Sequence, residues 1–232
     1  MTRTDSQINE PSTVDDDFAD ISASELEEMR TALPARRHSN KRIFSVMLGA
    51  ALVSLLAAFV LAVDAIKLAE NPETALFCNV NAVLNCGSVA LSWQASAFGF
   101  PNVFLGLMFE PMVVTMALLG LSGIKLPRWF ALTEQVIYFF ATAFAIWLFT
   151  QSLFVIGAVC PWCLVITLAT PVILMSLLHY NIREDNIWRS GVSRERARSF
   201  VRNHGDLYVV IGWFVLIFVA LLAKYGPALI GQ

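Results

Sequence analysis

Long apolar runs alternate with short polar segments along the whole chain. Five runs are close to the roughly 17 to 25 residues that a helix needs to cross a hydrocarbon core of about 30 Å. They occupy residues 43–63, 103–121, 129–149, 160–178 and 207–223. The pattern predicts an all-α fold, an integral membrane helical bundle of five transmembrane helices. The composition agrees, because 57% of the residues are hydrophobic and 15% are charged, which is too apolar for a soluble domain of this length.

Basic residues gather in the segments that lie on one predicted side of the membrane. They precede the first run, separate the second from the third, and supply six arginines in residues 183–202. Cytoplasmic loops are enriched in Lys and Arg. The sequence therefore predicts a multi-pass plasma membrane protein with a cytoplasmic amino terminus. The connections that follow the first and third runs are expected on the extracytoplasmic side, which is the oxidising compartment.

The polar segments define the expected domain organisation. Residues 1–42 carry half of the acidic side chains and few aromatic ones, a composition that predicts a disordered cytoplasmic tail. The first run is too long for a cleaved signal peptide and should stay as an anchor. Residues 43–178 should form a four-helix core, with an extracytoplasmic loop at 64–102. Residues 179–206 are expected as a basic cytoplasmic loop or short surface helix, and residues 207–232 as the fifth helix and a short outer tail.

One pair of the four cysteines opens the fourth run, in the sequence Cys160-Pro161-Trp162-Cys163. A CxxC motif places two sulfurs about one helical turn apart, so they can form a disulfide or exchange with an incoming thiol. Proline is favoured at the first helical position, and the amides of a helix amino terminus stabilise a thiolate. We therefore expect a lowered pKa at Cys160, as the more exposed member, and Cys163 facing the bundle interior.

The other pair, Cys78 and Cys86, lies in a segment with several asparagines and with Gly87 directly after the second cysteine. Such residues favour turns and a mobile backbone. A mobile outer pair could exchange with a soluble partner and then with the CxxC by thiolate attack. Because both pairs fall on the same predicted side, the sequence indicates a two-stage dithiol relay.

Other interpretations of the cysteines remain open. Cys78 and Cys86 could form a structural disulfide in a non-enzymatic membrane scaffold. Four cysteines could also hold zinc, but seven residues between Cys78 and Cys86 are too many for the usual second half-site. The three histidines fall on the cytoplasmic side, which also disfavours a Cys-His hydrolase; they are His38, His179 and His204.

Residues 43–178 resemble the vitamin K epoxide reductase family, in particular its bacterial members that oxidise dithiol proteins at the expense of quinone. The resemblance rests on the loop pair, on Ser92 and Trp93 after it, on the sequence FPNVFLG at 100–106, and on the CxxC. It implies that these residues form a four-helix catalytic core, and it implies a quinone cofactor, menaquinone or ubiquinone. It also implies a separate secreted partner with a thioredoxin fold of the DsbA-like kind, which the protein would reoxidise to support disulfide formation in exported proteins.

The resemblance also implies roles for individual residues. Cys86 would exchange with Cys160, Cys163 would face the quinone, and Cys78 would exchange with the partner. Asn102 and Ser92 would support the quinone site, to which we also assign Trp93. Apart from the resemblance, the aromatic residues Trp93, Phe98 and Phe100 could form an interfacial apolar lid over the four-helix pocket, or could serve as ordinary interfacial anchors. Thr167 stands where some members have tyrosine, which counts against epoxide chemistry. A vitamin K or epoxide reductase that runs on partner thiols would use the same cysteines and is the alternative enzymatic function.

Two carboxyl groups could supply protons for quinone reduction, Asp64 and Glu110. Asp64 could instead be an interfacial carboxylate paired with Lys67, and Glu110 could bond to a neighbouring helix. Glu134, near the inner end of the third run, is expected to reach cytoplasmic water. Pro171 should bend the fourth helix.

Overall fold

The computed structural model describes residues 39–187 and 191–230, with side chains up to residue 226. Its long helices are α2 (Asn40–Glu70), α4 (Val103–Leu121), α5 (Arg128–Gln151), α6 (Pro161–Arg183) and α8 (Gly205–Ile230). Within the described residues, five helices are long and apolar enough to cross a membrane. The predicted all-α bundle is confirmed. Of the predicted acidic tail, residues 40–42 belong to α2, and residues 1–38 lie outside the described part of the chain.

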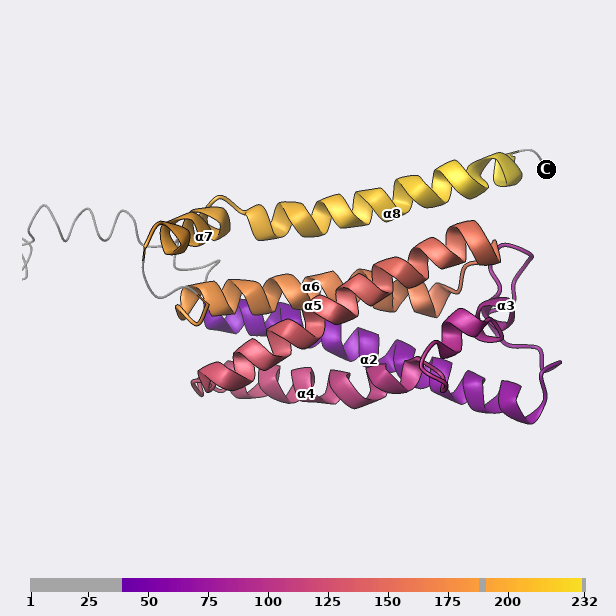
Figure 1. Cartoon of the computed structure of the whole chain (residues 1–232), viewed down its shortest axis with the longest axis horizontal. Coiled ribbons are helices and arrows are strands. Elements are labelled where there is room, and N and C mark those ends of the chain that lie inside the picture. Colours follow the sequence, from indigo (N-terminus) through magenta and orange to yellow (C-terminus); the bar gives the residue numbers. More distant parts are fainter. Residues whose placement is uncertain (1–38, 188–190, 231–232) are drawn as a thin grey trace, which may run out of the picture. The chain divides into compact units, whose positions relative to one another are not determined.

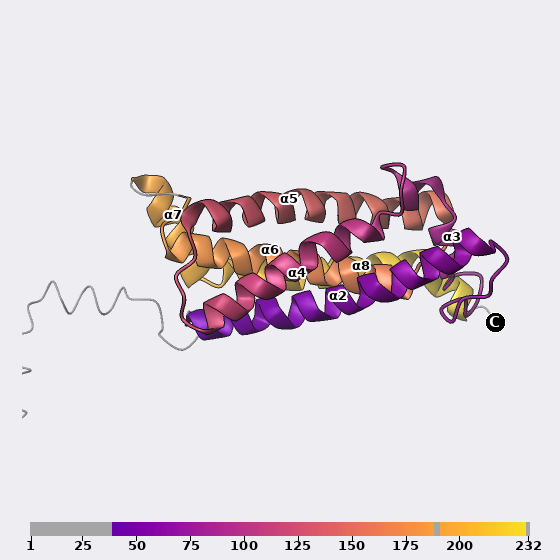
Figure 2. The same ribbon diagram turned by 90° about the horizontal axis from the view of Figure 1, so that it is seen from below.

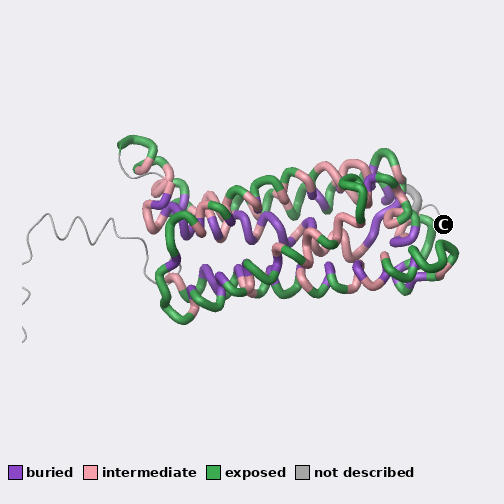
Figure 3. Tube along the Cα trace, turned by 60° about the horizontal axis from the view of Figure 1, so that its bottom comes forward, coloured by how far each residue is buried: buried purple, intermediate pink, exposed green. Residues whose placement is uncertain are grey.

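The helices pack side by side within one unit, residues 37–232 (Figures 1 and 2). α2 packs against α4 and α6, α5 packs against α6, and α8 lies along α6. The main apolar core is formed by residues from α2, α4, α5 and α6. Figure 3 shows buried positions along the inner faces of the helices and exposed ones along the outer faces. Many exposed side chains are large and apolar, such as Phe59, Phe140 and Phe218, as expected for a surface that faces lipid.

Small residues let α2 and α4 approach closely. A Cβ atom at Gly106 would meet Ala58 Cβ at 3.2 Å, and one at Gly120 would overlap the ring of Phe44. Contacts of this kind are typical of packing between membrane helices, where small residues allow the backbones to come together. Phe44 is buried and also packs against Tyr180 of α6. Phe44 of α2 therefore contacts both α4 and α6, which joins three of the core helices.

Pro171 explains how α8 is attached to α6. Proline has no N–H, so the carbonyl of Thr167, four residues earlier, has no partner within the helix. The indole Nε1 of Trp213 in α8 donates to that carbonyl at 3.0 Å. Apolar residues of α8, including Ile217 and Tyr225, are buried against the turn that precedes α6. The proline predicted to bend α6 thus creates the hydrogen-bond acceptor that α8 uses.

Several short elements lie where α2 ends and α6 begins, and we name this the cysteine end. They are α3 (Cys86–Ala90), the 3-10 helix η2 (Trp93–Ser96) and the π-helical turn η3 (Ser152–Ile156). α2 continues to Glu70, because Pro72 is the first residue that disfavours a helix before it. The connection expected at 64–102 therefore begins at residue 71.

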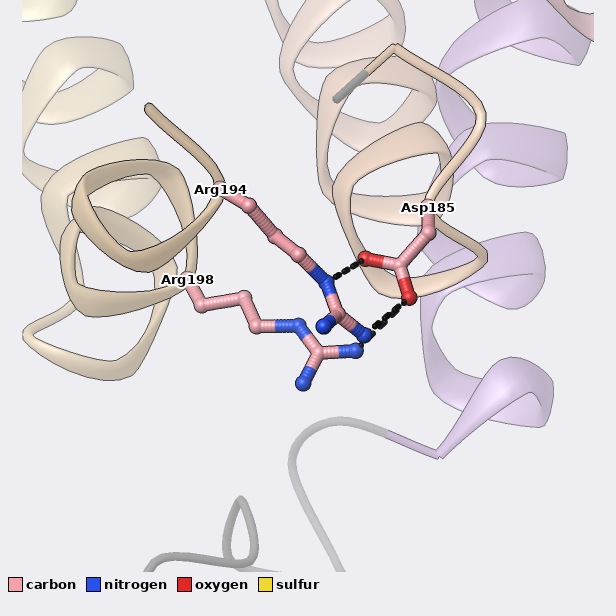
Figure 4. Close-up of polar contacts among 3 residues, drawn as sticks. All are labelled: Asp185, Arg194 and Arg198. Carbon is pink, nitrogen blue, oxygen red and sulfur yellow. Dashed lines mark hydrogen bonds and ion pairs between the residues drawn. The ribbon is translucent and has the colours of Figure 1, made fainter. Parts of the chain in front are cut away.

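The opposite end of the bundle carries the basic residues, and we name it the basic end. There α6 continues to Arg183, and α7 (Val192–Arg202) follows within the segment expected as a basic loop or short surface helix. Asp185 accepts hydrogen bonds from Arg194 at 2.8 and 2.7 Å and from Arg198 at 2.8 Å (Figure 4). The two arginines lower the pKa of Asp185, chiefly through the hydrogen bond from Arg194. This contact fixes α7 against the end of α6.

Candidate active site

Asparagine side chains hold the cysteine loop in place by bonding to its backbone. Asn81 Oδ1 accepts from the N–H groups of Val83 and Leu84, and Asn79 Oδ1 accepts from Gly87 N–H at 3.0 Å. Asn85 caps α3 by accepting from Ser88 N–H at 2.9 Å. The turns that the sequence predicted here are present. The predicted mobility of the loop stays a prediction.

Two backbone hydrogen bonds fasten this loop beside the CxxC motif. Val159 N–H donates to Val83 carbonyl at 2.7 Å, and Asn85 N–H donates to Val159 carbonyl at 3.1 Å. They form an isolated parallel bridge between Leu84 and Val159. Because Asn85 precedes Cys86 and Val159 precedes Cys160, the bridge brings the two cysteines together.

The four cysteines gather at this point. Cys78 and Cys86 form a disulfide, whereas Cys160 and Cys163 are thiols. Cys160 Sγ lies 3.3 Å from Cys86 Sγ. The two sulfurs are therefore close enough for a thiolate at Cys160 to exchange with the Cys78–Cys86 disulfide. The two pairs, which are 74 residues apart at this contact, are brought together as the relay hypothesis requires.

Cys160 occupies the N-cap of α6, just before the membrane-spanning helix, and Pro161 takes the first helical position. Its sulfur accepts from Cys163 N–H at 3.4 Å. The hydrogen bond from the Cys163 thiol, and then the backbone N–H groups of Cys163 and Trp162, lower the pKa of Cys160 against the effect of burial. A lowered pKa is what the sequence predicts. The expected exposure was wrong, because Cys160 is buried under the loop and Cys163 is the half-buried member.

Asp64 lies beside the disulfide pair, on the last turns of α2. Its side chain is largely buried, with Oδ2 4.0 Å from Cys78 Sγ and Oδ1 3.9 Å from Lys67 Nζ. The predicted pairing with Lys67 is confirmed. Trp162, whose role the sequence leaves undefined, packs against the cluster that contains Cys78, Cys86 and Cys160.

A cavity of about 450 Å³ opens beneath the cysteines, between α2, α4, α5 and α6. Its wall is mostly apolar, and Cys86, Cys160 and Cys163 reach it. The volume falls in the range of roughly 300 to 1,000 Å³ typical of small-molecule sites. Among the described residues, no part of α8 lines the cavity. The four-helix core can therefore enclose a ligand in contact with the thiols.

Ser92, Gln94 and Asn102 supply polar groups to the cavity wall. Asn102 Nδ2 donates to the Gln94 carbonyl at 2.6 Å, while Asn102 Oδ1 is buried without a hydrogen-bond partner. Ser92 Oγ donates to the Val89 carbonyl at 2.6 Å. Ser92 and Asn102, to which the resemblance gives a role at a quinone site, thus both line the cavity, and their contact with a quinone stays a prediction. Gln94, which sequence reasoning missed, is buried and bonds to Gln151.

Trp93 is not among the residues that line the cavity. It is 67% exposed and packs against Trp147, which stacks on Phe144, and Phe98 packs on Phe144 from the other side. Phe144 itself lines the cavity. The predicted aromatic group is present beside the cavity, and contact between Trp93 and a ligand stays a prediction.

Glu110 lies deeper in the cavity wall and joins three helices. Its Oε1 accepts from Ser54 Oγ of α2 at 2.5 Å, and its Oε2 accepts from Tyr138 Oη of α5 at 3.0 Å. The predicted bond to a neighbouring helix is confirmed twice. The prediction that Glu134 reaches cytoplasmic water is wrong, because its side chain is 0% exposed. It lies on the inner face of α5, one turn from Tyr138, where the sequence alone could not place it.

A comparison with family models matches the chain to the Vitamin K epoxide reductase family over residues 45–178. The match covers more than half of the chain and includes all four cysteines. A search of curated proteins gives no match, and a search of solved structures gives none either.

Proposed function

Because the chain belongs to the vitamin K epoxide reductase family, it is a multi-pass membrane oxidoreductase, and we propose that it couples thiol oxidation to quinone. In this proposal it is a quinone-dependent thiol:disulfide oxidoreductase that reoxidises a secreted DsbA-like partner. The observation that carries the proposal is the 3.3 Å distance between Cys160 Sγ and Cys86 Sγ. A scaffold with two inert disulfides gives no reason for this contact between the pairs.

The cysteines would pass the disulfide outward by four thiol–disulfide exchanges. Cys86 thiolate attacks the oxidised Cys160, Cys163 leaves as a thiolate, and a Cys86–Cys160 disulfide forms. Cys78 then attacks Cys86, and Cys160 leaves. This restores the arrangement in the structure, with Cys78 joined to Cys86 and two free thiols at the CxxC. A partner thiolate then attacks Cys78, and Cys86 leaves. The partner's second thiolate attacks the partner sulfur of this mixed disulfide, and Cys78 leaves.

The cavity suits a quinone in size and chemistry. Its wall is apolar, and the buried Oδ1 of Asn102 still needs a donor, which the hydroxyl of a reduced ring can provide. When bound, a quinone would accept two electrons and two protons. The loss of two electrons and two protons converts the Cys160 and Cys163 thiols into a disulfide. Asn102 and Ser92 would hold the ring, and Asp64 beside Cys78 would take or give thiol protons.

The proposed orientation places the cysteine end outside the cell and the basic end in the cytoplasm. It rests on the arginines and lysines that follow α4 and α6 and precede α2. A soluble partner would then reach Cys78 from the oxidising compartment.

Thiol trapping of the purified, reduced protein tests the proposal. After addition of a soluble quinone, we expect four thiols to disappear while two quinols form per chain, measured by alkylation and by quinol absorbance. Cys163→Ala should abolish quinol formation. Cys78→Ala is the matched control, because it should lose exchange with the partner and keep quinone reduction at the CxxC.

The outcomes separate the alternatives. Thiols that stay reduced, with no quinol formed, would favour the stapled scaffold. Reduction of a quinone epoxide at the expense of partner thiols would favour the reverse enzyme. If Cys163→Ala reduces quinone as fast as the wild type, the role of the CxxC in the proposal is wrong.

A further inference from the structure

Glu134 is a buried carboxyl group in the membrane-spanning part of the bundle. It is fully buried, and neither of its oxygens has a hydrogen-bond partner among the described residues. Burial of a carboxylate without donors is costly, so such a group inside a membrane protein usually has a function. Ala131 and Tyr138, about one turn before and after Glu134 on α5, belong to the main apolar core of the bundle.

The position of Glu134 connects it to the cavity. Tyr138 follows it by four residues on α5 and therefore lies on the same helix face, about 6 Å along the axis. Tyr138 bonds to Glu110, and both residues line the cavity. Glu134 and Tyr138 on α5 and Glu110 on α4 thus follow one another from the interior of the bundle to the cavity wall. They form a row of groups that can each bind and release a proton.

Polar groups continue from Glu134 toward the basic end. Asn181 of α6 is fully buried and donates from Nδ2 to the Ala131 carbonyl at 3.1 Å and to Gln135 Oε1 at 3.2 Å. These acceptors lie on α5 within one turn of Glu134. Asn186, between α6 and α7, donates to Asn181 Oδ1 at 2.9 Å. Hydrogen-bonding groups thus extend from the α6–α7 connection into the core.

We propose that Glu134, Tyr138 and Glu110 form a proton path that joins the basic end of the bundle to the cavity beside the cysteines. The inference rests on the proposed function, which consumes protons in the cavity. Glu110 would be the last carrier, and Glu134 would receive protons from the basic end. Asp64, at the cysteine end, serves the thiols and not this path.

The path separates the two proton exchanges of the reaction. When the Cys160 and Cys163 thiols form a disulfide, two electrons pass to the acceptor in the cavity, and two protons leave at the cysteine end. The acceptor takes up two protons, which the path delivers from the basic end. Each turnover would then remove two protons from one side of the membrane and release two on the other.

A purely structural role is the competing explanation for these groups. Glu110 bonds to α2 and α5 and would stabilise the bundle whether or not it moves a proton. Glu134 makes no such bond. The variant Glu134→Gln therefore tests transport with little loss of packing, and Glu184→Gln, at the end of α6 outside the row, is the matched control.

Infrared spectroscopy of the full-length protein without quinone gives a readout that needs no turnover. Protonated carboxyl groups absorb at a different infrared frequency from carboxylates, and their bands shift when hydrogen is replaced by deuterium. Glu110→Gln and Glu134→Gln each identify one band by its loss. We expect Glu134→Gln to slow deuterium exchange at Glu110 by about tenfold or more, and Glu184→Gln to leave it unchanged. Equal exchange in Glu134→Gln and the wild type would overturn the path.

A pH assay with the protein inserted in sealed vesicles identifies the side of the membrane from which protons are taken. A membrane-impermeant thiol outside reduces only molecules whose cysteine end faces outward, so the basic end of each active molecule faces the lumen. We expect a lumenal pH dye to report alkalinisation in step with quinol formation, and Glu134→Gln to slow both by about tenfold or more. Quinol formation without a lumenal pH change would refute the path. Absence of quinol in the wild type would refute the proposed function instead, and the infrared exchange would then decide the path alone.

Discussion

The two ends of the bundle are built in different ways. At the cysteine end, backbone hydrogen bonds between the loop and Val159 set the positions of Cys86 and Cys160. At the basic end, side-chain hydrogen bonds hold the elements together. Asp185 bonds to two arginines of α7, and Asn186 bonds to Asn181 in the core. Sulfur exchange needs two atoms at contact distance, and a backbone bridge fixes that distance directly. The basic end has only to close the bundle and admit protons.

The largest effect is expected when a thiol of the CxxC motif is removed at the cysteine end. In Cys163→Ala, Cys160 can still attack Cys86 and release Cys78, and only Cys78 can reverse this exchange, because the second CxxC thiol is absent. We expect peptides joined by Cys86–Cys160 beside peptides joined by Cys78–Cys86, detected by mass spectrometry of digested peptides, and loss of essentially all quinone-linked turnover. Cys160→Ala should show the Cys78–Cys86 disulfide alone. The same peptide map for both variants would contradict the order of exchange.

The next effect is expected in the interior, between the two ends. Glu110→Leu removes the acceptor of two buried hydroxyl groups, Ser54 and Tyr138. Polar bonds inside membrane bundles contribute roughly 0.6 to 1.7 kcal/mol each, so we expect a loss of about 1 to 3 kcal/mol in the free energy of unfolding in detergent. Glu110→Gln, which keeps an acceptor, should lose less. Equal losses would mean that these bonds are not what Glu110 contributes.

The cysteine end was largely predictable from the sequence. Apolar run lengths located the five helices, and the CxxC with Pro161 predicted a helix amino terminus and a lowered thiol pKa. Local patterns carry such information because capping and turns depend on neighbours in the chain. The exposure of Cys160 was predicted wrongly, since the loop that covers it comes from 74 residues earlier. Nothing local encodes the bridge between Leu84 and Val159.

The interior was much less predictable. Glu110 stood out as a charge within an apolar run, but its partners Ser54 and Tyr138 come from two other helices. Glu134 was assigned to the surface because it lies near a helix end. Which face of α5 turns inward depends on how α5 packs against α6, and an apolar run shows no strong periodicity from which to read it.

A smaller effect is expected where α8 joins the core. Trp213→Phe keeps the ring but removes the donor to the Thr167 carbonyl, which Pro171 leaves without a partner in α6. We expect a loss of about 0.5 to 1.5 kcal/mol in the free energy of unfolding. In Trp213→Phe with Pro171→Ala, the helix N–H at residue 171 should restore a partner and recover part of the loss. No recovery would show that Trp213 acts through its packing on Phe149.

The smallest effect is expected at the basic end, at the contact between Asp185 and the two arginines. Asp185→Asn keeps an acceptor but removes the charge, and we expect the unfolding temperature to fall by at most about 2 °C. Because the folded protein holds the pKa of Asp185 below its ordinary value of 3.8, the contribution is present above that pH. It is lost as the pH falls through the lower pKa of the folded state.

Thermal unfolding of the wild type and Asp185→Asn in detergent at several pH values checks this. The two curves should differ near neutral pH and converge in acid. Glu195→Gln on α7 should follow the wild type throughout, because within the described residues Arg194 and Arg198 form their ion pairs with Asp185 and not with Glu195 (Figure 4). Quinone-linked turnover should be unchanged in Asp185→Asn, since the contact holds α7 and lies outside the row of Glu134, Tyr138 and Glu110. A loss of turnover without a loss of stability would extend the proton path to Asp185. The contact at the basic end would then take part in proton transfer as well as hold α7.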